Sequence, residues 1–154
     1  MARRTHEDTQ ITINTILDVA TEQLITLGYE KMSYTTLSDQ TGISRTGISH
    51  HFAKKVDIPR ALQGRLLKMM MDKLDLSNNE AAFIGSWKHH FDDAEFMAIW
   101  RLALLMTVCE HHTPYLCDFQ LQVEAVASYK LNKDCKHIIE WLIGLTLLTL
   151  HKAQ

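Results

Sequence analysis

The apolar positions of the chain follow a helical period from one end to the other. No stretch alternates apolar and polar residues over a useful length, and only two prolines and six glycines interrupt the chain. A first helix, which Gly28 would end with a left-handed cap, is predicted from apolar side chains three or four residues apart: Ile13, Ile16, Leu17, Ala20, Leu24 and Leu27. The fold class that this pattern predicts is all-α.

Two short helices joined by a tight turn are predicted after the first helix. Ser33 stands where an N-cap would start the helix "YTTLSDQT", which Gly42 closes. Ser44 would cap a third helix that runs to about His51, and Ile43 would fill the interior at the turn. Three short helices with a tight second turn form a helix-turn-helix module.

Five further helices are predicted in the rest of the chain. The fourth begins near Asp57 and Pro59, where proline is tolerated because first-turn amides have no helical acceptor, and runs to about Leu76. Helices of about 80–91, 93–111, 114–130 and 133–151 follow from their boundary signals: Ser77 with Glu80, Asp92 with Glu95, Thr113 before Pro114, and Asn132. The eight helices divide into a three-helix module over 1–56 and a five-helix bundle over 57–154.

Length and composition exclude several classes of protein. The chain has 154 residues, of which 46% are hydrophobic, enough for one core or for one core with a small module. The most apolar run, "HIIEWLIGLTLLTL", contains Glu140 and is too short for a membrane span. The start, "MARRTHEDTQ", has no apolar segment of the kind that a secretory signal needs. We therefore expect a cytoplasmic protein without a membrane partner.

Charge is nearly balanced overall but unevenly distributed. The chain carries 16 Lys and Arg against 18 Asp and Glu. Between residues 44 and 60, one acid, Asp57, accompanies four basic side chains: Arg45, Lys54, Lys55 and Arg60. His50 and His51 can add positive charge to this segment. The result is a local basic patch on a weakly acidic protein.

The segment "ILDVATEQLITLGYEKMSYTTLSDQTGISRTGISHHFAKKVDI" resembles the N-terminal domain of TetR-family transcriptional regulators. The positions that carry this resemblance cover about a third of the chain: Gly28, Tyr29, Ser33, Leu37, Gly42, Ile43, Ser44, Ile48, His51, Phe52, Lys55 and Ile58. The short length, "KMSYTTLS" and "SRTGISHHF" look most like the LuxT group, short regulators linked to quorum-sensing control.

The resemblance implies a function and a domain plan. It implies a homodimeric repressor without enzymatic activity or cofactor that binds a palindromic DNA operator through its helix-turn-helix module. The C-terminal bundle would then serve for dimerisation and for binding a small-molecule effector that releases the DNA.

Three positions depart from the family pattern. Thr46 stands where the family usually has a small residue or proline, and Ser49 replaces the usual tyrosine that contacts phosphate. Lys54 stands where a capping Ser or Asn is usual, which leaves the cap of the fourth helix open. The phosphate contact of the missing tyrosine would pass to His50 or His51.

Arg45 and Thr46 are the predicted base-reading residues. Arg45 follows the Ser44 cap and can donate two parallel hydrogen bonds to O6 and N7 of guanine, although a surface arginine near phosphate is the alternative. Thr46 offers a hydroxyl group and a methyl group. Gly47 either lets the backbone approach DNA closely or lets the third helix pack tightly.

Other side chains of the module are predicted to contact the DNA backbone. Ser49, His50, His51 and Lys55 form one phosphate row, with His51 equally open to a packed role. On the other side, Thr35 or Thr36 and the amides of the helix start at Ser33 and Tyr34 offer a binding site to a phosphate. Arg3 and Arg4 form either an arm for the minor groove or a disordered tail.

The C-terminal half supplies candidates for a ligand pocket and a dimer interface. An apolar ligand could lie among Met69, Met70, Trp87, Phe91, Phe96, Trp100 and Met106, although the same spacing is typical of an ordinary core. The last helix is apolar on more than one side, which favours a dimer interface that includes Tyr129, Ile138, Trp141, Leu142, Leu145 and Leu148. The alternative buries that helix inside a monomer.

Metal and thiol chemistry is not predicted. His89 and His90 with Asp93, or Cys109 with His112, lack the ligand patterns of known zinc sites. The three cysteines, which include Cys117 and Cys135, show no CxxC spacing, so each is predicted to be a reduced, buried small hydrophobe. The alternative function that remains is a helical module that binds a partner or ligand without binding DNA.

Overall fold

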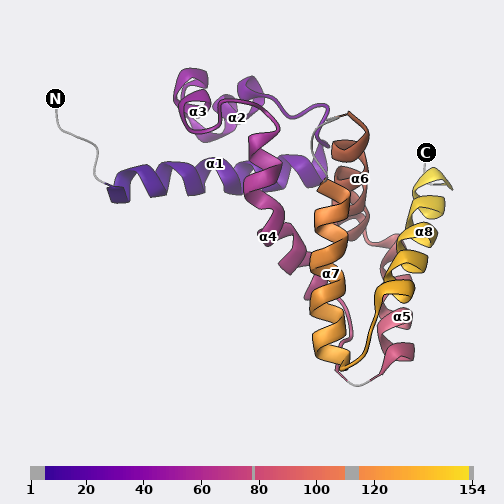
Figure 1. Cartoon of the computed structure of the whole chain (residues 1–154). Helices are drawn as coiled ribbons and strands as arrows, with labels where there is room; N and C mark the ends of the chain where they lie inside the picture. Colours follow the sequence, from indigo (N-terminus) through magenta and orange to yellow (C-terminus); the bar gives the residue numbers. More distant parts are fainter. Residues whose placement is uncertain (1–5, 78, 110–114, 153–154) are drawn as a thin grey trace. The chain divides into compact units, whose positions relative to one another are not determined.

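The computed structural model describes residues 6–77, 79–109 and 115–152. Within these ranges the chain forms eight α-helices, one short 3-10 helix and no strand, which confirms the all-α prediction (Figure 1). Their bounds are α1 His6–Thr26, α2 Tyr34–Thr41, α3 Arg45–His51, α4 Asp57–Met71, α5 Glu80–His89, η1 His90–Asp92, α6 Ala94–Cys109, α7 Tyr115–Leu131 and α8 Lys136–Lys152. No helix in these ranges is long and apolar enough to cross a membrane.

The chain divides into two compact units within α4. The first unit ends at Leu62 and the second begins at Gln63. The domain boundary that the sequence predicts, between residues 56 and 57, lies six residues earlier, where α4 begins. The difference arises because the first turns of α4 contribute Ile58 and Leu62, both fully buried, to the first unit.

The core of the first unit follows the predicted apolar stripe of α1. Helix α1 contacts α2, and α2 contacts α3. Ile16, Ala20 and Leu24 are buried as expected, and they share the core with Met32, Leu37 and Ile48. Leu27 is a correction, because 46% of it is exposed. It follows the last residue of α1, so the helical stripe no longer directs its side chain inward.

The turns around α2 and α3 are built by the residues that the sequence indicates. Ser33 Oγ accepts the amide of Thr36 at 3.1 Å, and the Ser33 amide donates to Thr36 Oγ1 at 2.9 Å, which completes a capping box. Gly42 ends α2 with φ +73°, in the left-handed region that favours glycine. Ser44 Oγ accepts the Gly47 amide at 3.1 Å at the start of α3.

The start of α4 is capped without the usual Ser or Asn. Asp57 Oδ2 accepts the backbone amide of Lys54 at 2.8 Å. Asp57 is the first residue of α4 and Lys54 lies three residues before it, so this bond closes the turn that leads into the helix. Asp57 therefore fixes the entry to α4 where Lys54 offers no capping side chain.

The second unit is organised around Trp87 of α5. Its indole ring packs edge-on against Phe83 and Phe96, and tilted against Trp100, with ring centroids 5.2 to 5.8 Å apart. Its Nε1 donates to Thr146 Oγ1 of α8 at 2.9 Å, so the polar end of the ring is satisfied inside the core. Helices α6, α7 and α8 contact one another around this cluster.

Helix α4 and the cap of α5 differ from the sequence prediction. Helix α4 ends at Met71 rather than near Leu76, since the Lys73 and Leu74 amides donate to carbonyl oxygens three residues back and the Asp75 amide donates to Ser86 Oγ of α5. Asn79, not Ser77, caps α5, because Asn79 Oδ1 accepts the Ala82 amide at 2.8 Å. The Ser77 hydroxyl group binds Asp75 instead.

The predicted caps of α6 and α8 also differ from those in the structure. Asp93, not Asp92, caps α6, since Asp93 Oδ1 accepts the Phe96 amide at 3.0 Å. Asn132 ends α7 rather than starting α8: its φ is +50°, and the next amide donates to Ser128 O at 3.2 Å. The predicted cap at Thr113 and Pro114 lies outside the described residues.

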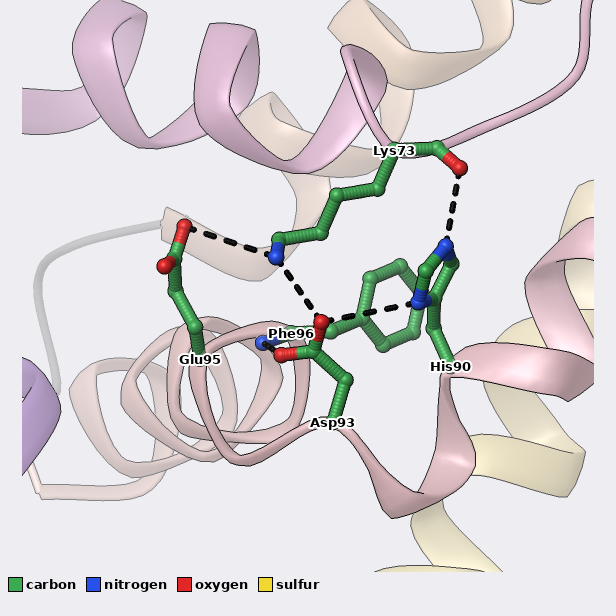
Figure 2. A network of polar contacts seen from close by, with 5 residues as sticks. All are labelled: Lys73, His90, Asp93, Glu95 and Phe96. Carbon is green, nitrogen blue, oxygen red and sulfur yellow. Dashed lines mark hydrogen bonds and ion pairs between the residues drawn. The ribbon is translucent and has the colours of Figure 1, made fainter.

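Asp93 also joins the segment after α4 to the start of α6 (Figure 2). The Lys73 ammonium group lies 2.8 Å from Asp93 Oδ2 and 3.8 Å from a carboxylate oxygen of Glu95. The His90 ring lies 2.9 Å from the Lys73 carbonyl oxygen and 3.5 Å from Asp93 Oδ2. Partial burial opposes ionisation of Asp93, but the hydrogen bonds from Lys73 and from backbone amides outweigh it and lower the pKa of the carboxyl group.

We expect Asp93→Asn to lower the melting temperature at pH 7, with a difference from wild type that shrinks below about pH 4. A carboxyl group with a lowered pKa stabilises the fold above its ordinary pKa, and this stabilisation is lost as the pH falls through the lowered value. Asparagine keeps a cap for α6, so the substitution removes mainly the charge. Thermal unfolding followed by circular dichroism between pH 3 and pH 8 tests this.

The matched control is Asp92→Asn, since Asp92 is exposed and its replacement removes the same negative charge one residue away. It should leave the melting temperature unchanged over the same pH range. If the melting temperature of Asp93→Asn stays below that of wild type by the same amount down to pH 3, the electrostatic explanation is contradicted.

Candidate nucleic-acid interface

An open groove lies between the first turn of α2 and the exposed side of α3. Its volume is about 490 Å³, and it is lined by Tyr34, Thr35, Arg45, Thr46 and Ser49. All five were predicted to bind DNA from their positions in the sequence. The fold therefore brings one predicted phosphate-binding helix start and the predicted base-reading helix to one surface.

Arg45 and Thr46 occupy the first two positions of α3, and both are exposed. Side chains at the start of a recognition helix are the ones that reach base edges when the helix lies in the major groove. Ser49, one turn later, is half-buried and donates to the Thr46 carbonyl oxygen at 3.1 Å. Its hydroxyl group thus keeps an acceptor site for the groove but reaches less far than a tyrosine.

Tyr34 has a structural role that its position in the sequence did not indicate. Its hydroxyl group donates to the Phe52 carbonyl oxygen at 2.7 Å, which ties the first residue of α2 to the residue that ends α3. Burial, and secondarily the Asp57 carboxylate, raise the pKa of Tyr34, so the hydroxyl group stays protonated and keeps donating. Tyr34 thus lines the groove while its hydroxyl group is bonded to the backbone at the end of α3.

We expect Tyr34→Phe to lower the free energy of unfolding by about 0.5–1.5 kcal/mol, the usual net contribution of one such hydrogen bond. The ring remains, so the groove keeps its apolar wall. Urea unfolding of the variant and of Tyr129→Phe, whose side chain is 84% exposed, measures the difference. Equal stability of both variants would show that the bond to Phe52 contributes nothing.

Gly47 is required by packing within the first unit. A Cβ atom at this position would lie 3.1 Å from Ile43 Cγ2 and 3.3 Å from Ser44 Oγ, both closer than ordinary contacts. The glycine thus leaves room for the residue that fills the turn and for the N-cap. Of the two explanations that the sequence left open, this geometry favours tight packing.

The rest of the predicted phosphate row lies at the end of α3. His50 is exposed and His51 half-buried, and their rings meet edge-on with centroids 5.3 Å apart. The Lys55 ammonium group lies 4.3 Å from the centre of the Tyr29 ring and 3.4 Å from the Glu30 carbonyl oxygen. The cation–π contact orients Lys55, so its charge is held close to the helix-turn-helix rather than free in solvent.

Comparison with known protein families matches both units. The model described as "Bacterial regulatory proteins, tetR family" matches residues 16–62. The model described as "Tetracycline repressor LuxT C-terminal domain" matches residues 63–150, more than half of the chain. The chain belongs to the TetR family. Its C-terminal domain is of the LuxT type, which confirms the resemblance seen in the sequence. A comparison with curated proteins found no match.

The groove lies in the part of the chain that matches the TetR-family N-terminal domain. The chain is a TetR-type transcriptional regulator, and the matched N-terminal domain is the DNA-binding domain of that family. The family indicates a regulator rather than an enzyme. Arg3 and Arg4, the predicted minor-groove arm, lie outside the described residues.

The predicted effector pocket of this TetR-family regulator is filled by its own side chains. Phe91 and Met69 are half-buried, and the others are completely buried: Met70, Trp87, Phe96, Trp100 and Met106. The ring contacts among them are those of a close-packed core. These residues form part of the hydrophobic core, which is the second interpretation that their helical spacing allowed.

The surface of α8 carries most of the predicted dimer residues. Trp141, Leu145 and Leu148 line a shallow apolar groove together with Gly144 and Leu147. Tyr129 of α7 is 84% exposed, and Ile138 is half-buried. Leu142 is a correction, because it is completely buried within its own chain and cannot meet a partner.

The histidines and cysteines of the TetR-family chain form no site among the described residues. No group of three or more His, Cys, Asp or Glu side chains in that part of the chain could hold a metal ion. Cys135 is buried as predicted, and burial raises the pKa of its thiol. Cys117 is a correction, because it is exposed: it lies on the outer side of α7, between the buried Tyr115 and Phe119. The side chain of Cys109 lies outside the description.

Gln23 is the residue of the first unit that sequence reasoning missed. It is only 3% exposed and lies on the buried side of α1. A signal was present, since Gln23 follows Ile16 by seven residues and Ala20 by three, which places a polar side chain in the apolar stripe. Its hydrogen bonds to α2 are described below.

Proposed function

We propose that this TetR-type regulator is a repressor that binds a palindromic operator as a homodimer. The observation that carries the proposal is the groove in which Arg45 and Thr46 of α3 lie beside Tyr34 and Thr35 of α2. A helix start beside a recognition helix allows one surface to bind a phosphate and a base edge together. The protein would act in the cytoplasm, where bacterial DNA is found.

Arg45 is assigned the main base contact in this proposal. It is exposed at the first position of α3, and a guanidinium group can bind O6 and N7 of guanine with two parallel bonds. Thr46 contacts the neighbouring base through its hydroxyl or methyl group. The α2 amides and Thr35 bind the flanking phosphates, and Ser49 joins them when its hydroxyl proton turns from the Thr46 carbonyl oxygen to a phosphate. His50, His51 and Lys55, at and just after the end of α3, complete the phosphate row.

The homodimer is assigned to the apolar surface of α8. Trp141 is 47% exposed and Leu148 66% exposed, on a helix whose opposite side is buried in the bundle. Exposed apolar groups on one helix are typical of a two-fold interface, in which the same surface of each subunit meets its copy. A two-fold protein matches a palindrome, because each half-site meets one recognition helix.

The effector is assigned to the aromatic core of the C-terminal domain. In the present state this core is filled, so an apolar ligand has to displace side chains such as Phe91, which is half-buried. Release of DNA would follow if the opened core favoured a different arrangement of the dimer. The likeness to the LuxT group supports a link to quorum-sensing control.

Genome-wide immunoprecipitation of the tagged protein from its host tests the proposal. The recovered sites should share a palindrome, and fluorescence anisotropy should show binding that weakens steeply between two salt concentrations. Recovery of no enriched sequence, together with co-purification of a stoichiometric protein partner, would favour the alternative, a helical module that binds a partner without DNA.

A further inference from the structure

Gln23 connects α1 to the start of α2 through a cluster of buried hydrogen bonds. Gln23 Nε2 donates to the Thr36 carbonyl oxygen at 3.0 Å and to Gln40 Oε1 at 2.8 Å. Gln23 Oε1 accepts from Thr36 Oγ1 at 2.7 Å. The Thr36 carbonyl can only accept, so the orientation of the Gln23 amide is determined by its partners. Gln40 Nε2 in turn donates to Glu22 Oε2 at 2.9 Å.

Thr36 links Gln23 to the cap at the N-terminus of α2. Its hydroxyl group has one proton, and the shortest of its contacts is the one to Gln23 Oε1. When that proton points to Gln23, the oxygen is left to accept the Ser33 amide at 2.9 Å, which is half of the capping box. A second acceptor, the Ser33 carbonyl oxygen, lies 3.0 Å away. Gln23 thus holds Thr36, the residue that closes the capping box, by its hydroxyl group and by its carbonyl oxygen.

The first turn of α2 is thus held on two sides. Gln23 holds it to α1, and the bond from Tyr34 to the Phe52 carbonyl holds it to the end of α3. Between these two attachments lies the wall of the groove formed by Tyr34 and Thr35, opposite Arg45. Gln23 itself, at 3% exposure, does not reach the groove.

We propose that Gln23 is a positioning residue for DNA recognition: it sets the place of the α2 start so that phosphate and base are bound together. The inference rests on the proposed DNA-binding function. It extends that function to a buried side chain that touches no DNA, and it makes the α2 cap part of the recognition apparatus.

The first test uses Gln23→Met, which keeps the length of the side chain and removes its polar atoms. Its control is Ile16→Val, a buried change on the same helix that leaves the polar cluster untouched and lowers stability modestly. At a temperature where both variants are folded, Gln23→Met should bind the operator at least about tenfold more weakly than the control. Its plot of log affinity against log salt should also be less steep, by about one phosphate contact. Equal affinity of the two variants overturns the inference.

The second test uses Gln23→Glu, in which the new carboxyl group can replace the amide donor only when it is protonated. Burial, the neighbouring acceptors and the Glu22 carboxylate, which reaches the cluster through Gln40, all favour the protonated form. The operator affinity of this variant, divided by that of wild type at the same pH, should rise as the pH falls from 8 to 5.5. Division by the wild-type value removes the pH dependence that the rest of the protein–DNA interface contributes to both proteins. A ratio that does not change with pH overturns the inference.

Amide hydrogen exchange provides a test that needs no DNA. In Gln23→Met, the amides of Ser33 and Thr36 should exchange at least about tenfold faster than in Ile16→Val, because Thr36 has lost the two hydrogen bonds that hold it to α1 and the cap opens more often. Unchanged exchange overturns the inference whatever the DNA measurements give. Faster exchange in a protein whose wild type binds no DNA would overturn the proposed function and leave the control of α2 by Gln23 intact.

Discussion

Arg45→Ala should lose operator affinity mainly at a single base pair. Removal of a bidentate contact to guanine costs about 1–3 kcal/mol, which corresponds to roughly a tenfold to hundredfold loss for the preferred operator. On operators substituted at that base pair, the variant and wild type should bind almost equally. Fluorescence anisotropy on the operator and on its single-base-pair variants, at two salt concentrations, measures this pattern.

Arg45→Lys is the matched control for this prediction. It keeps the positive charge at the start of α3, where Arg45 is exposed beside the groove, but cannot form the planar pair of bonds. We expect it to retain the salt dependence of wild type and to lose the base preference. If Arg45→Ala instead weakens binding to every sequence equally, Arg45 is a phosphate contact and another residue reads the base.

Leu148→Asp should convert the regulator to a monomer and reduce operator affinity by more than about a hundredfold at nanomolar protein. Leu148 is 66% exposed, so a carboxylate there is solvated in the single chain and the monomer keeps its fold. In the proposed two-fold interface the same charge would be buried beside its own copy, which is strongly unfavourable. A monomer binds only one half-site and loses the high effective concentration of the second subunit.

The control for the dimer prediction is Val108→Asp on α6. Val108 is similarly exposed, at 61%, and lies on a helix outside the proposed interface. Sedimentation velocity should show dimers for wild type and for Val108→Asp, and monomers for Leu148→Asp. A dimeric Leu148→Asp protein would place the interface elsewhere on the molecule.

Local signals predicted the helix-turn-helix well because each acts over a few residues. Ser33, Gly42 and Ser44 have the predicted capping roles, and each bonds or turns the backbone within four positions of itself. The later boundaries were less predictable. Neighbouring Ser, Asp and Asn residues compete for the same cap, and in the structure Asn79 and Asp93, not Ser77 and Asp92, accept the cap hydrogen bonds.

The sequence predicted which residues line the candidate site, but not the hydrogen bonds that hold them in place. The five residues of the groove were all named from the sequence, since a helix-turn-helix pattern indicates which positions of α2 and α3 are exposed. The inward bond of Tyr34 spans 18 positions, and those of Gln23 span 13 and 17. Such bonds have no signature in a local window.

The sequence by itself determined the all-α class, the helix-turn-helix with its caps, and the exposed Arg45 and Thr46. These features depend on periodicity and on interactions between close neighbours in the chain. The TetR-family membership rests instead on the family models that match residues 16–62 and 63–150. Only the tertiary structure decided that α4 divides the two units, that Leu142 is core, and that Gln23 is buried against α2. These outcomes depend on which surfaces meet, because burial and long-range hydrogen bonds are properties of the packed chain and not of any one segment.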